Sequence, residues 1–188
     1  MSQRHYLYLY CTDLDYFPVH REDFIRSCQD YGLLSKPYDS QGENLYLVGD
    51  HFLQHISFLG CSPYLKVYPE NDQDSDFCSA VVPVSTTPVQ FLSSQQKIRP
   101  RCPACKKSLP PIDTMLEDWR HHQSNKSVTC PTCNATSALY TLDWRKNAGF
   151  INFHIAISNI FPKEAIPGEA LLNWLKSISE SEWKYFYV

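Results

Sequence analysis

The chain has 188 residues, of which 43% are apolar and 14% aromatic, and a formal net charge of −3. This length fits one domain, or one domain with a small insert, and the apolar content is sufficient for a packed core, which excludes a globally disordered protein. No apolar run is long enough to span a membrane, and the first residues lack the apolar segment and cleavage site of a signal peptide. We therefore expect a cytoplasmic protein with no membrane association.

The first part of the chain predicts a strand, a helix and several short strands. Apolar residues and tyrosines alternate in residues 5–11, which is typical of a strand. Pro18 can begin a helix, acidic residues occupy its first turn, and Gly32 is suited to end it. Further strands are expected at 44–50, 56–59 and 77–85.

The last part predicts strands on both sides of a helix. Residues 136–144 have the composition of a strand, and residues 149–161 predict one long alternating strand. An amphipathic helix is expected at 166–179 and a final strand at 182–188. These patterns predict an α+β fold, in which two β-α-β units form a mainly antiparallel sheet domain with an inserted four-cysteine zinc ribbon. The expected boundaries are 1–95 for the N-terminal part of the domain, 96–148 for the zinc-ribbon insert and 149–188 for the C-terminal unit.

The expected insert differs from the rest of the chain in composition and charge. From residue 86 the sequence becomes polar, then basic and proline-containing, as is typical of a boundary. Residues 95–146 contain nine Lys/Arg and four Asp/Glu, a balance of +5, whereas the balance of the remaining residues is −8. The insert is therefore the basic part of an acidic protein.

Two cysteine pairs define the insert. Cys102 and Cys105 are separated by two residues, and after a further 24 residues Cys130 and Cys133 repeat the same spacing. A two-residue gap lets both thiolates of a tight turn converge on one ion. Two such turns placed face to face supply the tetrahedral set of sulfur ligands that zinc prefers.

The two pairs also share a proline, because they read CPAC and CPTC with Pro103 and Pro131 in the same position. In this feature residues 99–140 resemble the zinc-ribbon class, whose paired knuckles commonly read CPxC. The resemblance implies a structural element with one Zn²⁺ per chain. Because zinc ribbons occur in proteins of many functions, it implies no particular activity.

The expected zinc is structural. Four cysteines fill the tetrahedron and leave no position for the water or substrate that a catalytic zinc requires. The metal would stabilise an insert that is too short to build a core of its own. His121 and His122 lie between the pairs and are expected to be exposed rather than ligands. Redox chemistry of the cysteine pairs and an iron centre held by the same thiolates are the alternatives.

One further cysteine is a candidate for catalysis. Cys61 follows an apolar strand at a glycine turn, where the start of a helical turn would lower its thiol pKa. His51 or His55, spaced four residues apart, could act as its base. We expect Cys61 to be packed in the core instead, because cysteine is among the most buried residue types. The histidines alone do not form a HExxH metal motif, because Phe52 occupies the position of the glutamate.

Basic residues surround the cysteine pairs and could contact a phosphate backbone, with Trp119 stacking on a base. The alternative is a solvated face that keeps the insert soluble. These residues are Lys97, Arg99, Arg101, Lys106, Lys107, Arg120 and Lys126.

The leading hypothesis is a non-enzymatic zinc-binding module whose ribbon contacts a macromolecular partner, which we expect to be a protein. The first alternative is nucleic-acid binding through the basic ribbon. The second is a cysteine-dependent enzyme that uses Cys61 with His51 or His55. The sequence contains no Gly-rich phosphate loop and no GxSxG motif that would indicate another enzyme class.

Overall fold

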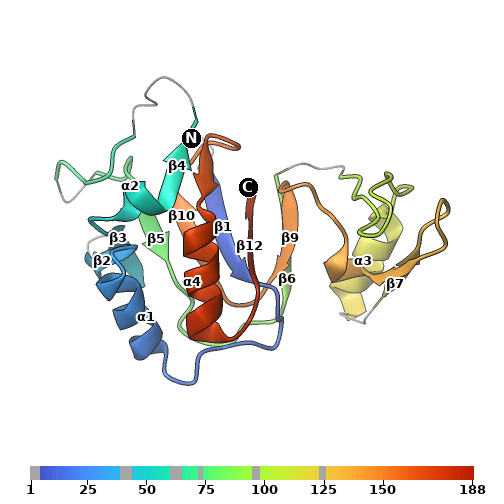
Figure 1. Ribbon diagram of the computed structural model, residues 1–188, viewed down its shortest axis with the longest axis horizontal. Helices are drawn as coiled ribbons and strands as arrows, with labels where there is room; N and C mark the ends of the chain where they lie inside the picture. The colour runs from blue at the N-terminus through green and yellow to red at the C-terminus, as the bar shows by residue number, and fades with distance from the viewer. Residues whose placement is uncertain (1–4, 39–43, 60–64, 72–73, 95–97, 123–125) are drawn as a thin grey trace.

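Figure 1 shows the protein as a computed structural model, which describes residues 5–38, 44–59, 65–71, 74–94, 98–122 and 126–188. Cys61 and Lys97, both selected from the sequence, lie outside the described residues. Within these ranges no helix is long and apolar enough to cross a bilayer.

An antiparallel sheet forms the centre of the larger lobe. Among the described residues it has six strands in the order β12–β1–β10–β5–β3–β2, and every neighbouring pair is antiparallel. The strands are β1 (Tyr6–Cys11), β2 (Leu34–Pro37), β3 (Leu45–Val48), β5 (Ser79–Val81), β10 (His154–Ser158) and β12 (Trp183–Tyr187). The expected mixture of helices with a mainly antiparallel sheet is therefore confirmed.

Helices α1 (Arg21–Asp30) and α4 (Glu169–Ser179) cover one face of this sheet (Figure 1). Leu7 and Leu9 of β1 are fully buried and alternate with half-exposed tyrosines, because successive residues of a strand point to opposite faces. These leucines share one core cluster with Phe24 of α1 and with Leu171 and Leu175 of α4. The apolar alternation in the sequence thus fixes which face of the sheet the helices cover.

The sheet strands that precede and follow each of these helices in the chain are not neighbours in the sheet. β1 and β2 are separated by β10, β5 and β3, and β10 and β12 are separated by β1. The two β-α-β units expected from the sequence are therefore not confirmed as pairs of adjacent strands.

The expectation of one long strand at 149–161 is wrong. This segment forms β9 (Ala148–Ile151), which pairs with β6 (Gln90–Ser93), and then β10, which belongs to the main sheet. The chain bends at Asn152 and Phe153. The Asn152 side-chain amide donates to the Leu14 carbonyl at 2.8 Å, and the buried Phe153 ring contacts Phe24 and Trp183. These long-range contacts stabilise the bend, and the alternation of residues in the sequence does not reveal them.

The smaller lobe lies beyond β6 and β9 in Figure 1 and has a core of its own. Its elements are α3 (Asp113–His122), β7 (Ser127–Thr129), β8 (Thr136–Ala138) and the 3-10 helix η2 (Leu139–Thr141). Leu116 and Trp119 of α3 pack with Leu139, Trp144 and Phe150, and the Trp119 and Phe150 rings meet edge to face at 4.7 Å. The apolar packing around α3 was not expected from the sequence, and Phe91 of β6 and Phe150 of β9, which lie outside the expected bounds of 96–148, contribute to it.

Strand β9 packs closely against β12 at the junction of the two lobes. Phe186 is fully buried, and a Cβ at Gly149 would lie 2.6 Å from its ring. Only glycine allows this approach of backbone to ring. At the other end of the larger lobe, α2 (Phe52–His55) leads into β4 (Ile56–Phe58), which pairs with β11 (Ala165–Pro167).

Candidate metal centre

Four sulfur atoms from two separate turns converge in the smaller lobe. The Sγ atoms of Cys102 and Cys133 are 3.7 Å apart, as are those of Cys105 and Cys130, and all four lie within 4.8 Å of one another. Zinc–sulfur bonds of about 2.3 Å in a tetrahedron place two sulfurs about 3.8 Å apart. The four cysteines predicted from their spacing therefore form a cluster that could hold a metal ion.

The first cysteine pair lies in a turn closed by two backbone hydrogen bonds. The Lys106 amide donates to the Cys102 carbonyl at 2.9 Å, and the Cys102 amide donates to the Lys107 carbonyl at 2.9 Å. Lys106 has a φ of 62°, a left-handed conformation that lysine rarely adopts. This backbone reversal lets Cys102 and Cys105 direct their sulfurs to one point.

The second pair repeats the same turn. The Asn134 amide donates to the Cys130 carbonyl and the Cys130 amide donates to the Ala135 carbonyl, both at 2.9 Å. Asn134 has a φ of 57° and occupies the position that Lys106 has in the first turn. Asparagine tolerates this conformation better than lysine does. The two knuckles are thus equivalent in hydrogen bonding and in backbone conformation.

Each knuckle closes a short antiparallel pairing. Arg101 forms an antiparallel bridge with Ser108 around the first knuckle. Thr129 of β7 pairs with Thr136 of β8 around the second, and their hydroxyl oxygens are 3.1 Å apart. The paired residues occupy the same positions relative to the cysteines in both knuckles. This internal repeat agrees with a zinc-ribbon-like arrangement, in which two equivalent turns face each other.

Hydrogen bonds from backbone amides lower the pKa of the first cysteine of each knuckle and so favour its thiolate form. The amides of Cys105 and Ala104 lower the pKa of Cys102. The corresponding amides of Cys133 and Thr132 lower the pKa of Cys130 to about 6. Hydrogen bonds to the charged form of a thiol favour that form, and the thiolate is the form that binds metals.

The pKa of Cys133, in the same cluster, shifts in the opposite direction. The Ala135 amide lowers the pKa of Cys133, but hydrogen bonds to the neighbouring thiols, Cys105 first, outweigh this effect and raise the pKa to about 12. Four negative charges at these distances repel one another, so all four sulfurs can be thiolates together only around a cation. The electrostatics of the cluster therefore favour a bound metal ion.

The metal cluster is continuous with the core of the smaller lobe. Cys102 and Cys130 are buried among its apolar residues, Cys105 is half-buried and Cys133 is exposed. Because the sulfurs supply four ligands, the arrangement leaves no open coordination position of the kind that a catalytic zinc needs. A metal ion held by all four sulfurs would lie beside the core of the smaller lobe.

The two histidines between the cysteine pairs lie on α3 and are exposed, as expected. His122 lies 3.0 Å from a carboxylate oxygen of Asp118, which also contacts Lys126 at 2.6 Å. Among the described residues, the group of possible metal ligands around the sulfurs contains the four cysteines and neither His121 nor His122.

His51 and His55 have different surroundings in the larger lobe. His51 is exposed at the start of α2, and the two imidazole rings are 6.3 Å apart. His55 Nε2 is 2.9 Å from the Tyr31 carbonyl oxygen, and its ring stacks on the Tyr31 ring, which in turn stacks on Trp174. His55 therefore has a packing role, while its proposed partner Cys61 lies outside the described residues.

The cysteines elsewhere in the described chain are buried core residues. Cys11, Cys28 and Cys78 are each fully buried. Burial raises the pKa of Cys28, and it raises the pKa of Cys78 to about 12. These thiols are protonated at neutral pH and do not have the properties of nucleophiles.

The predicted basic residues differ in their surroundings. Arg120 pairs with Glu117 at 3.5 Å and Lys126 with Asp118 at 2.6 Å, so carboxylates of α3 partly neutralise both cations. Arg99, Arg101, Lys106 and Lys107 are exposed on the segment that carries the first knuckle. The sequence analysis missed Arg145, Lys146 and Lys184, which lie far from the CxxC motifs in the chain but line a cleft together with Lys106.

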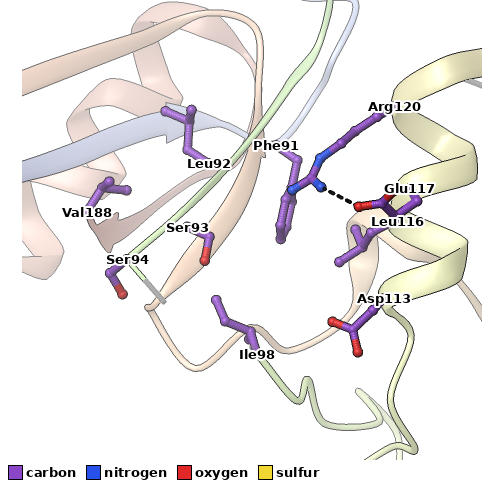
Figure 2. Close-up of a pocket in the computed structure, with 10 residues that line it drawn as sticks. All are labelled: Phe91, Leu92, Ser93, Ser94, Ile98, Asp113, Leu116, Glu117, Arg120 and Val188. Carbon is purple, nitrogen blue, oxygen red and sulfur yellow. Dashed lines mark hydrogen bonds and ion pairs between the residues drawn. The ribbon is translucent and has the colours of Figure 1, made fainter. Parts of the chain in front are cut away.

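A separate hollow of about 590 Å³ lies between β6 and α3 (Figure 2). Figure 2 shows Phe91, Ser93 and Ser94 on the strand side and the side chains of α3 on the other side. The charged residues of this wall are Asp113, Glu117 and Arg120, with the ion pair between the last two drawn as a dashed line. Neither a thiol nor an imidazole is among the residues that line it. The hollow thus has mixed charge, and the Glu117 carboxylate in it is engaged by Arg120.

No protein-family model, no curated protein and no solved structure matches this chain. The geometry of the site is therefore the basis for the functional interpretation.

Proposed function

We propose that this protein is a non-enzymatic binding protein in which one Zn²⁺ is held by Cys102, Cys105, Cys130 and Cys133. The observation that carries the proposal is the convergence of four sulfurs, with cross-knuckle separations of 3.7 Å, from two equivalent turns. Zinc is the metal that four thiolates in a tetrahedron suit best. In this role the ion is not catalytic, because the four sulfurs occupy all of its coordination positions.

The proposed role of the metal is to fix the shape of the smaller lobe. Cys102 and Cys130, one from each knuckle, belong to the cluster that includes Leu109, Leu139 and Trp144, so the ion would join the two knuckles at that cluster. Metal binding to such a site contributes directly to folding stability, because the unfolded chain does not present the four ligands together. The lobe then offers a rigid, basic surface to a macromolecular partner, which we propose to be a protein.

Affinity capture from the host cell tests this function. The full chain is used as bait in three forms: wild type, Cys130→Ser, which removes one metal ligand, and Cys28→Ala, which removes a buried thiol outside the site. Nuclease treatment separates direct protein contacts from contacts through nucleic acid. We expect the same protein to be captured by wild type and by Cys28→Ala, and to be lost with Cys130→Ser. Capture that survives loss of the metal, or that nuclease abolishes, would contradict the proposal.

A further inference from the structure

A cleft of about 500 Å³ separates the edge of the main sheet from the smaller lobe. One wall is β12, with Trp183, Lys184 and Tyr185. The opposite wall is the first knuckle, with Pro103 and Lys106, followed by residues 140–146. A cavity of this size is typical of a site for a small molecule or for a short segment of another chain.

The hydrogen-bond register shows that β12 has a free edge at this cleft. Tyr6 and Val188 exchange both backbone hydrogen bonds, and the Thr12 amide donates to the Glu182 carbonyl. Because hydrogen-bonded and non-hydrogen-bonded pairs alternate along an antiparallel ladder, the even-numbered residues of β12 bond to β1. The amide and carbonyl of Tyr185 therefore point away from β1.

Two residues further along β12, at Tyr187, the smaller lobe already bonds to this edge. The Tyr187 amide donates to the Lys146 carbonyl at 3.0 Å. This contact shows that the edge of β12 can accept a neighbouring backbone. Because this bond occupies the edge at Tyr187, an added strand could pair only with the segment around Tyr185.

The lining residues confirm that the cleft follows the strand edge. Lys184 and Tyr185 are consecutive, so their side chains point to opposite faces of the sheet. Both nevertheless line the same cleft. A hollow lined by residues from both faces of an edge strand follows that edge, to which the amide and carbonyl of Tyr185 point.

The cleft carries positive charge. Among the described residues that line it, Lys106, Arg145, Lys146 and Lys184 are cationic and Asp143 is acidic. A carboxylate oxygen of Asp143 accepts a hydrogen bond from the Arg145 amide at 3.0 Å, so that acid is occupied by the backbone. This concentration of cations in a protein of net charge −3 favours an anionic ligand.

The turn that carries two of these cations has an unusual backbone. Arg145 and Lys146 have φ values of 54° and 61°, and the Asn147 amide donates to the Trp144 carbonyl at 3.1 Å. A turn with two consecutive left-handed residues normally contains glycine or asparagine. Below these cations, the cleft is lined by the buried residues Trp144 and Trp183.

We propose that this cleft binds an extended acidic segment of a protein partner, which adds as a strand to the free edge of β12. The segment exchanges backbone hydrogen bonds with Tyr185, and its carboxylates contact the cationic rim. A nucleic acid would use the cations but not the strand edge, whereas an extended acidic segment can use both. This inference rests on the proposed function and specifies where the partner binds.

A labelled peptide that alternates glutamate and valine tests the proposal with the zinc-loaded full chain. Binding is measured by fluorescence anisotropy for wild type, Lys184→Glu and Lys36→Glu. Lys36 is a matched control, because it is an exposed lysine on β2, the opposite edge strand of the same sheet. We expect saturable binding that weakens by about tenfold in Lys184→Glu and is unchanged in Lys36→Glu.

Three further measurements identify the mode of binding. The same peptide with N-methyl groups on alternate amides keeps its charge but loses strand pairing, and it should bind more weakly. Amide hydrogen exchange at Tyr185 should slow when the unmodified peptide binds. Oligothymidylate should bind more weakly than the peptide. Equal binding of the N-methylated peptide, absence of saturable peptide binding, or tighter oligothymidylate binding that Lys184→Glu abolishes would each overturn the proposal.

These outcomes are separable from failure of the proposed function. Zinc content is measured on every sample, and the capture experiment with Cys130→Ser does not depend on the peptide. If the peptide fails while zinc is present and the partner is still captured in a metal-dependent way, the partner binds elsewhere on the protein and only the cleft assignment is wrong.

Discussion

The sulfur atoms of Cys105 and Cys130 lie 3.7 Å apart, although 24 residues separate them in the chain. The intervening residues include α3, whose buried Leu116 and Trp119 join the same core cluster as Cys130. Packing of α3 therefore helps to bring the knuckles together, and the proposed cation would offset the repulsion between the thiolates. The core of the smaller lobe and its metal are expected to stabilise each other.

Removing the metal should loosen the smaller lobe before the main sheet. A chelator takes away the cation, so the thiolates repel and the knuckles separate, whereas β1 and β10 have a different core. Hydrogen exchange measured by mass spectrometry should show faster exchange in residues 99–140 first. Cys28→Ala, with its four metal ligands intact, is the control and should respond to chelator as wild type does. Simultaneous loosening of both lobes would contradict this account.

Replacing Glu180 by glycine should stabilise the protein. Glu180 follows α4 with a φ of 56°, a left-handed conformation that costs a non-glycine residue about 1 kcal/mol. Glycine removes this cost, so the free energy of unfolding should rise by up to that amount in denaturant titrations. Ser177→Gly, within the same helix, is the matched control and should destabilise by up to about 0.5 kcal/mol. A loss of stability in Glu180→Gly would show that its conformation is not strained.

Replacing Gly149 by alanine should destabilise the junction between the lobes. The new Cβ would lie 2.6 Å from the Phe186 ring, which is buried and cannot move freely. We expect a cost of about 1–3 kcal/mol, typical of overpacking. The double variant Gly149→Ala with Phe186→Leu should be less destabilised than the sum of the single variants, because the smaller side chain relieves the clash. Strict additivity would mean that the two residues do not meet.

The buried thiols should resist alkylation. They should also make the free energy of unfolding fall as the pH rises into the alkaline range. Burial raises the pKa of Cys78 to about 12, so the folded state holds its proton more tightly than the unfolded state does. The resulting stability is full below the unfolded pKa of about 8.5 and is lost as the pH rises from there toward the folded pKa. Unfolding titrations at increasing pH should show this loss, and Cys78→Ala should reduce it.

Cys61 can be compared with the buried thiols in the same labelling experiment. If Cys61 is packed, as we expect from the sequence, it should react with iodoacetamide as slowly as Cys28 and Cys78 in the folded protein. Selective labelling of Cys61 near neutral pH would favour the alternative of a cysteine-dependent enzyme, because a catalytic thiolate must be accessible and have a lowered pKa. Activity tests of Cys61→Ala would then replace the binding experiments as the first priority.

The sequence was most informative where one short-range pattern decides the structure. Alternation predicted β1, amphipathic spacing predicted α1 and α4, and the CxxC spacing predicted the four converging sulfurs. Sequence patterns did not predict the structure where it depends on contacts between residues far apart in the chain. The bend at Phe153 depends on rings from α1 and β12, and α3 is weakly apolar, with two buried residues in its ten.

The cleft could not be predicted for a related reason. Lys106, Lys146 and Lys184 come from three separate segments, and no spacing rule connects them. Their proximity follows from the order of the sheet, which places β12 at an edge next to the smaller lobe. A pattern of charge along the chain indicates only that the insert is basic, not which other lysines it faces.

X-ray absorption spectroscopy at the zinc edge, combined with elemental analysis of freshly purified protein, tests the central claim most directly. The account predicts about one zinc per chain, with four sulfur neighbours at about 2.3 Å and no nitrogen or oxygen ligand. Cys102→Ser should lose the metal, whereas Cys28→Ala should keep it. Less than half an equivalent of zinc in the wild-type protein, or a first shell that contains nitrogen or oxygen, would contradict the account.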